Sequence, residues 1–123
     1  LVAPKKAYTR ADDGLTQDWG RSTRVFCNPP WSDMGPWIKR SAEACWNNAS
    51  QVIHVCKLDT STEWWRTYAW EADQICFPGR TRYVLPDGDR MGTPAFETAI
   101  LHFGGGLDEF RAAFSPLGRV VDL

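Results

Sequence analysis

Val52-Ile53-His54-Val55-Cys56-Lys57-Leu58 is a nearly unbroken apolar run that is rich in β-branched residues. Such a run predicts a strand at the centre of a sheet that is covered on both faces. Thr60 and Glu63, directly after it, have the spacing of a capping box, which predicts a helix through about Ala72. A buried strand followed closely by a helix indicates an α/β fold.

Similar elements follow on both sides of this run. Short apolar runs at 25–27, 75–77 and 98–103 predict three further strands. A helix is predicted between Gly35-Pro36 and Asn47-Asn48, and a hairpin arm is predicted at 82–85, between two proline-containing turns. We therefore expect one domain over residues 1–123 with an irregular lead-in at 1–22. Its core should be a mixed sheet with helices on both faces and antiparallel closing strands.

The composition predicts a soluble globular protein rather than a disordered one. Hydrophobic residues make up 43% of the 123 residues, charged residues make up 24%, and the formal net charge is −1. This balance gives no overall attraction to a phosphate backbone, so any affinity for nucleic acid must come from a local cluster of basic residues. The sequence has no signal peptide and no apolar stretch of membrane-spanning length, which predicts a cytoplasmic protein without membrane contact.

The cysteines and histidines predict core positions and no metal centre. The cysteines are Cys27, Cys45, Cys56 and Cys76. No two of them form a C-x-x-C pair and all lie within apolar runs, which is typical of buried thiols in a reducing compartment. His54 and His102 lie inside predicted strands, where a core position is the more common role. A zinc site needs clustered ligands, and we expect none.

The turn Asn28-Pro29-Pro30-Trp31, directly after the predicted strand at 25–27, carries groups suited to chemistry on an exocyclic amine. The lone pair of an adenine N6 or cytosine N4 amine is delocalised into the ring. A catalyst must therefore hold both N–H groups and turn the lone pair toward an electrophile. The Asn28 side-chain oxygen and the Pro29 carbonyl can accept these two hydrogen bonds, because the prolines restrict the backbone so that both oxygens point the same way. No general base is required.

Trp31 adds a flat ring on which a base can stack. A methyltransferase cannot reach its target atom inside a duplex, so it has to flip the nucleotide out. The same four residues would also serve as an ordinary strand-ending turn with a core Trp, because Asn and Pro are common at such positions. The tetrapeptide alone leaves both interpretations open.

Four segments of the chain, taken in order, form a more specific pattern. They are Asp12-Asp13-Gly14-Leu15 through Trp19, Val25 to Ser32 with Trp37 and Lys39, Gly79-Arg80 with Tyr83, and Pro94-Ala95-Phe96. This pattern, which spans about residues 8–103, resembles the phage-type DNA adenine-N6 methyltransferases, the Dam-like enzymes of phages and prophages. One departure is Trp31, which stands where that family more often has Tyr.

The resemblance implies a Rossmann-like, S-adenosylmethionine-dependent methyltransferase fold and an enzyme that methylates a flipped-out adenine in DNA. The catalytic residues it implies are Asn28, Pro29, Pro30 and Trp31. It further implies that the modification protects phage DNA from host restriction, with the host cytoplasm as the place of action.

Basic residues in the same segments are the candidates for DNA contact. Arg80, in the Gly-Arg segment, is expected to contact phosphate or to order the target loop, and Arg82 and Lys39 are further candidates. Arg40 and Arg90 belong to the same basic set, although charged residues are most often simply solvated surface.

The segments that match the family include few residues for cofactor binding. Members of this family carry an upstream strand and loop that hold much of the S-adenosylmethionine, and nothing before Leu1 supplies them, so we expect an incomplete fold. Asp59 follows a predicted strand and could face the cofactor. The N-cap of the helix that follows explains this residue equally well and is the favoured interpretation.

A second cofactor candidate lies near the end of the sequence. Gly104 and Gly105 form a glycine loop between a strand and a helix, and Asp122 could supply a carboxylate for ribose hydroxyls. The favoured interpretation is different: the glycines end the last strand of the sheet, and residues 104–123 form a helix and a tail.

The sequence leaves two other functions open. One is a catalytically inactive, truncated methyltransferase remnant that binds nucleic acid or protein. The other is an amine methyltransferase that acts on a substrate other than DNA.

Overall fold

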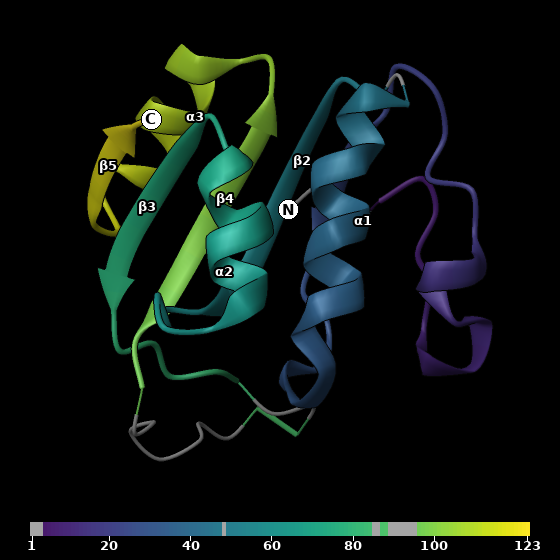
Figure 1. Ribbon diagram of the computed structural model, residues 1–123, viewed down its shortest axis with the longest axis horizontal. Coiled ribbons are helices and arrows are strands. Elements are labelled where there is room, and N and C mark those ends of the chain that lie inside the picture. Colours follow the sequence, from purple (N-terminus) through teal and green to yellow (C-terminus); the bar gives the residue numbers. More distant parts are fainter. Residues whose placement is uncertain (1–3, 48, 85–86, 89–95) are drawn as a thin grey trace.

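The protein forms a mixed α/β sheet with helices on both faces (Figure 1). The computed structural model describes residues 4–47, 49–84, 87–88 and 96–123. Within these residues the strands are β1 (Arg24–Cys27), β2 (Gln51–Lys57), β3 (Gln74–Gly79), β4 (Thr98–Gly104) and β5 (Arg119–Asp122). The α-helices are α1 (Met34–Trp46), α2 (Glu63–Tyr68) and α3 (Leu107–Phe114). The 3-10 helices are Arg10–Asp12, Gly14–Thr16, Trp31–Asp33 and Ala69–Glu71.

The direction of the strands decides which loops lie together. The strand order is β1-β2-β4-β3-β5; β1 and β2 are parallel, and β4 is antiparallel to both β2 and β3. β1, β2 and β3 therefore point the same way, and their carboxyl ends lie at one edge of the sheet, beside the start of β4. We call this the Asn28 edge, which is the lower edge in Figure 1. The opposite edge, where β4 and β5 end, is the Gly104 edge.

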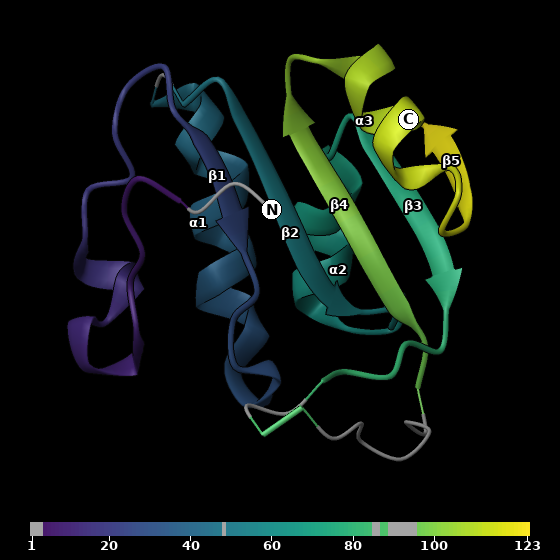
Figure 2. The same cartoon turned by 180° about the vertical axis from the view of Figure 1, so that it is seen from behind.

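Two layers of side chains hold the helices to the sheet. Side chains alternate between the faces of β4, so Leu101 and Phe103 pack in the larger core beneath α1 and α2. Ile100 faces the other way and packs with Phe110 of α3 in a smaller core. Figure 2, seen from behind, shows the sheet in front of α1 and α2. The predicted mixed sheet with helices on both faces is confirmed.

A buried histidine holds α1 against β2. The Nδ1 atom of His54 lies 2.7 Å from Ser41 Oγ, and its Nε2 atom lies 3.1 Å from Met34 Sδ. Burial lowers the pKa of His54 to about 3, so the ring is neutral at pH 7. His54 and His102 are both fully buried, as predicted.

The start of α2 differs from the prediction. The helix is capped by Thr62, whose Oγ1 atom accepts a hydrogen bond from Trp65 N at 3.3 Å, so the predicted capping box at Thr60 is wrong. The N-cap role favoured for Asp59 is also wrong. Its carboxylate instead accepts hydrogen bonds from Ser61 N and Ser61 Oγ, in a turn that precedes the helix.

Other element boundaries also differ from the prediction. The single helix predicted through Ala72 is an α-helix that ends at Tyr68 and continues as a 3-10 turn. The lead-in contains two 3-10 turns. Of the predicted hairpin arm, Val84 forms an isolated bridge and residue 85 lies outside the described residues, as do Arg90, Pro94 and Ala95.

The favoured view of the C-terminus as a helix and a tail is wrong in its second half. Residues 119–122 form β5, which pairs with β3. Val120 packs in the smaller core with Phe110, and this apolar burial stabilises the pairing of β5 with β3.

The cysteines are free; Cys27, Cys56 and Cys76 are buried and Cys45 is partly buried. Within the described residues no group of His, Cys, Asp and Glu side chains could hold a metal ion. No helix in that part of the chain has both the length and the apolarity needed to cross a bilayer.

Candidate active site

The turn after β1 connects the strand directly to α1. β1 ends at the buried Cys27, and the next residue, Asn28, is exposed. Pro30 has φ −59° and ψ 130° and leads into the 3-10 turn Trp31–Asp33, from which α1 begins. The Asn28 side chain forms no hydrogen bond with another described residue. Its amide oxygen is therefore available to a ligand at the carboxyl end of β1.

Three aromatic rings from separate segments meet beside this turn. The Trp31 ring lies 5.0 Å from the Phe96 ring with an interplanar angle of 49°. It lies 5.7 Å from the Tyr83 ring, in an edge contact at 88°. All three residues are only partly buried. We call them the ring cluster; contacts of this geometry fix the orientation of Trp31 and leave aromatic surface open to solvent.

The segment after β3 crosses the Asn28 edge and brings Tyr83 to Trp31. Figures 1 and 2 both show this segment passing from the end of β3 beneath β4 and β2 toward the start of α1. Tyr83 is anchored through its hydroxyl, which lies 3.4 Å from Oγ1 of the buried Thr98 at the start of β4. Arg80 and Arg82 lie on this segment, and both are exposed. The structure thus places these two predicted DNA contacts at the same edge as Asn28.

Lys57 and Asp59 lie at the end of β2, also at the Asn28 edge. Lys57 Nζ is 3.5 Å from Asp59 Oδ2 and 5.5 Å from the centroid of the Phe96 ring. The hydrogen bond from the Ser61 hydroxyl, with smaller contributions from Ser61 N–H and Lys57, holds the pKa of Asp59 below its usual range. Asp59 is therefore an ionised, half-buried carboxylate close to the ring cluster.

Lys39 lies apart from these groups. It is on the exposed side of α1, where its Nζ atom is 4.0 Å from Glu43 Oε1, one turn further along the helix. An exposed pair of this kind is weak. The structure therefore leaves Lys39 as a surface cation of α1, outside the cluster at the carboxyl ends of the strands.

The glycine loop lies at the opposite edge of the sheet. Gly104 has φ +97°, and a Cβ atom there would lie 2.5 Å from Ser50 O. The close approach that requires this glycine is thus to the chain's own backbone, which also accepts a hydrogen bond from Gly105 N at 3.0 Å. Asp73 Oδ2 accepts from Gly104 N at 2.7 Å. The structure does not bring Gly104 or Gly105 together with Asn28.

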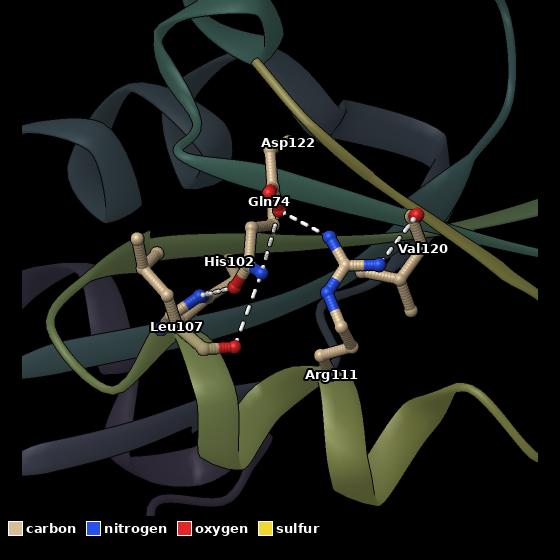
Figure 3. A network of polar contacts seen from close by, with 6 residues as sticks. All are labelled: Gln74, His102, Leu107, Arg111, Val120 and Asp122. Carbon is tan, nitrogen blue, oxygen red and sulfur yellow. Dashed lines mark hydrogen bonds and ion pairs between the residues drawn. The ribbon is translucent and has the colours of Figure 1, made fainter.

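Asp122 belongs to a network that ties α3 and β5 to the sheet (Figure 3). Gln74 Nε2 donates to Asp122 Oδ1 at 2.9 Å and to Leu107 O at 3.1 Å. Arg111 forms an ion pair of 2.5 Å with the same carboxylate oxygen. The hydrogen bond from Gln74, and then the contact with Arg111, hold the pKa of Asp122 below its usual range. This carboxylate already has partners and lies at the Gly104 edge.

The same network includes both ring nitrogens of His102. Because Gln74 Nε2 donates twice, its Oε1 atom is the acceptor that faces His102 Nδ1 at 2.7 Å. His102 Nε2 lies 2.8 Å from Gly105 O and 3.0 Å from Gln51 Nε2. The ring also stacks on Phe110 with a centroid separation of 4.6 Å. The polar groups of the Gly104 edge thus have partners within the protein.

Lys57 is the residue at the Asn28 edge that the sequence interpretation missed. A signal for it is present, because Lys57 is the one formally charged residue in the run at 52–58 and stands at its carboxyl end. In a strand that is otherwise buried, a charge at that position points to the loop edge where ligands of α/β sheets bind.

Comparison with known proteins identifies a family. The family model described as DNA N-6-adenine-methyltransferase (Dam) matches residues 3–117. No curated protein and no solved structure matches the chain. The family match covers nearly all of the sequence and includes the turn at Asn28, the segment with Arg80 and all of β1 to β4. The chain therefore belongs to the DNA N-6-adenine-methyltransferase (Dam) family.

Proposed function

We propose that this chain is a DNA adenine-N6 methyltransferase of the phage type, which transfers a methyl group from S-adenosylmethionine to a flipped-out adenine. The observation that carries the proposal is the turn after β1, in which Asn28 is exposed and Pro29 is buried, beside the ring cluster and at the edge where three parallel-running strands end. Ligands of α/β sheets bind at such edges. Its role would be to protect phage DNA from restriction in the cytoplasm of the host.

In this proposal the chain's own residues prepare the amine. The side-chain oxygen of Asn28 and the carbonyl of Pro29 accept the two N–H hydrogen bonds of the adenine amine. Pro30 keeps the turn rigid, and the Trp31 ring stacks on the base. Holding both hydrogens turns the nitrogen lone pair out of conjugation and toward the methyl donor. S-adenosylmethionine supplies the electrophilic methyl group when it is bound.

At the Asn28 edge, Asp59 has the chemistry needed to bind the methyl donor. Asp59 is an ionised carboxylate at the Asn28 edge, and a carboxylate in that position can accept hydrogen bonds from cofactor hydroxyl or amino groups. Gly104, Gly105 and Asp122 lie at the other edge and already have partners, so we leave them outside the proposed site. The proposed fold is Rossmann-like, and the common direction of β1, β2 and β3 supports it.

Arg80 and Arg82 are the proposed DNA contacts. Both lie on the segment that crosses the Asn28 edge, where they could bind phosphates that flank the flipped nucleotide. Lys39 would at most add a weaker, more distant contact from α1.

Methyl transfer tests the proposal directly. The chain is incubated with labelled S-adenosylmethionine and unmethylated duplex DNA, and cofactor binding is measured separately by calorimetry. Asn28→Ala should reduce transfer by about 100- to 1,000-fold, the usual loss when a hydrogen bond to developing charge is removed. Cofactor binding should not change. Asn47→Ala, at the C-cap of α1 near the other edge, is the matched control and should retain transfer.

The same experiment separates the other functions. A chain that binds no S-adenosylmethionine is not an enzyme in this form, and DNA binding that persists would identify it as an inactive binding module. Label that appears in RNA or protein instead of DNA would identify an amine methyltransferase with another substrate.

A further inference from the structure

Lys57 lies at the solvent-exposed end of a central strand, where its side chain can contact a ligand. It is the last residue of β2, where it pairs with Thr98 of β4. Its side chain is 43% exposed, although the rest of the strand is largely buried. The ammonium group is therefore held at the Asn28 edge by a rigid central strand and still reaches solvent.

The surroundings of Lys57 link it to the ring cluster. Its Nζ atom lies 5.5 Å from the centroid of the Phe96 ring, and the same ring lies 5.0 Å from that of Trp31. One aromatic ring thus contacts both the cation and the proposed base platform. A flat apolar surface beside a positive charge matches the chemistry of a nucleotide, which has a flat base and an anionic phosphate.

The partner of Lys57 in the protein can be exchanged at small cost. Asp59 Oδ2 lies 3.5 Å from the ammonium group, and both side chains are partly exposed. Ion pairs of this kind contribute about 0–1 kcal/mol, because solvent screens them. A phosphate, in contrast, gains from the release of condensed counterions when a lysine binds it.

We propose that Lys57 binds the backbone phosphate of the nucleotide whose base stacks on the ring cluster, and that it leaves Asp59 to do so. This inference rests on the proposed function and adds a DNA contact to it. Arg80 and Arg82 then bind the flanking phosphates, and Lys57 binds the phosphate of the target nucleotide itself.

The salt dependence of DNA binding tests the proposal. Binding of the chain to unmethylated duplex DNA is measured by fluorescence anisotropy between about 50 and 200 mM salt, and the logarithm of the affinity is plotted against the logarithm of the salt concentration. Lys57→Met keeps the apolar stem over Phe96 and removes the charge, so the slope should become shallower by about 0.9. Lys6→Met is the matched control, since Lys6 Nζ lies over the Tyr8 ring at 5.1 Å in the lead-in, and its slope should equal that of the unaltered chain.

Substitution of Asp59 provides a second test of the proposal. Asp59→Asn releases Lys57 from its partner and should raise the affinity for DNA in the presence of Lys57. In the Lys57→Met background the same substitution should have much less effect. A Lys57→Met slope equal to that of Lys6→Met, or an Asp59→Asn gain that persists without Lys57, overturns the proposal.

These outcomes are distinct from failure of the proposed function. A chain that binds DNA with a Lys57-dependent slope and transfers no methyl group supports the phosphate contact and overturns the enzyme. A chain that transfers methyl groups and has a Lys57-independent slope overturns this inference alone. A chain that does not bind DNA overturns both.

Discussion

The two edges of the sheet differ in the surroundings of their amide side chains. At the Gly104 edge, Gln74, His102 and Asp122 bond to one another or to the backbone, and Arg111 closes the network (Figure 3). At the Asn28 edge, the Asn28 amide is exposed without a partner among the described residues. A polar group that is bonded within the protein stabilises the fold, whereas the exposed amide of Asn28 can bond to a ligand.

The aromatic residues differ in the same way. Phe110, at the Gly104 edge, is 2% exposed and lies between the rings of His102 and Phe114. Trp31, at the Asn28 edge, has two aromatic neighbours and still remains partly exposed. The first arrangement stabilises the fold, whereas the second orients a ring that a ligand can still reach.

The largest effect should come from the Gly104 edge. Phe110→Ala removes a buried ring that connects α3 to β4, and it should lower the free energy of unfolding by about 3–5 kcal/mol. Chemical denaturation followed by circular dichroism measures this change. DNA affinity of the folded protein should stay as it is, because Phe110 lies far from the Asn28 edge.

A milder substitution guards against complete unfolding in that experiment. Phe110→Leu keeps most of the apolar volume and should cost clearly less than Phe110→Ala. Equal stability of Phe110→Ala and the unaltered chain would show that α3 does not hold the sheet together and would remove the contrast between the edges.

The chain's elements could be predicted from sequence wherever burial sets the pattern. The runs that became β1, β2 and β4 and the periodic helix α1 need no knowledge of distant contacts. The N-cap of α2 could not be predicted in the same way. Asp59, Thr60 and Thr62 are all acceptable caps by residue type, and in the structure Asp59 bonds to Ser61 in a turn while Thr62 caps the helix.

The candidate site was predictable in its local part only. Asn28 to Trp31 form one continuous segment, so the sequence displays them together. The ring cluster joins Trp31 to two residues that lie more than 50 positions further along the chain, and it exists because β3 runs parallel to β1 and its following segment crosses the edge. The role of Gly104 was misleading for a related reason, since a glycine required by the backbone of Ser50 looks the same in sequence as one required by a ligand.

Acidification should weaken the sheet through His54. Its pKa is lowered to about 3 by burial, whereas an unfolded histidine has a pKa of about 6.5. The stabilisation is therefore fully present above about pH 6.5 and is lost as the pH falls from there toward 3, because the unfolded chain takes up the proton first. The expected loss from this one group is about 1.4 kcal/mol per pH unit, or about 2 kcal/mol at pH 5.

His54→Gln isolates this contribution. Denaturant unfolding between pH 7 and pH 5 avoids the range in which carboxylates titrate, and the variant should lose stability less steeply than the unaltered chain. His102, whose pKa is also lowered by burial, remains in both proteins and cancels in the comparison. Identical slopes would mean that His54 is not held neutral against α1.

The last two substitutions test the contrast between the edges most sharply, because they compare two amide side chains. Gln74→Ala removes the hydrogen-bond partner of the Nδ1 atom of the buried His102 and should cost about 1–3 kcal/mol in the free energy of unfolding. The denaturant series used for Phe110→Ala measures this difference. A neutral result would mean that the network in Figure 3 does not stabilise the protein.

Asn28→Ala should change the free energy of unfolding by no more than about 0.5 kcal/mol, because the side chain is exposed and forms no hydrogen bond with the described residues. The same substitution is expected to have the largest effect on methyl transfer. A residue whose substitution leaves stability unchanged and removes activity contributes to ligand binding or catalysis and not to folding. If Asn28→Ala instead destabilised the protein as much as Gln74→Ala, the amide would be part of an ordinary strand-ending turn, and the Asn28 edge would resemble the Gly104 edge after all.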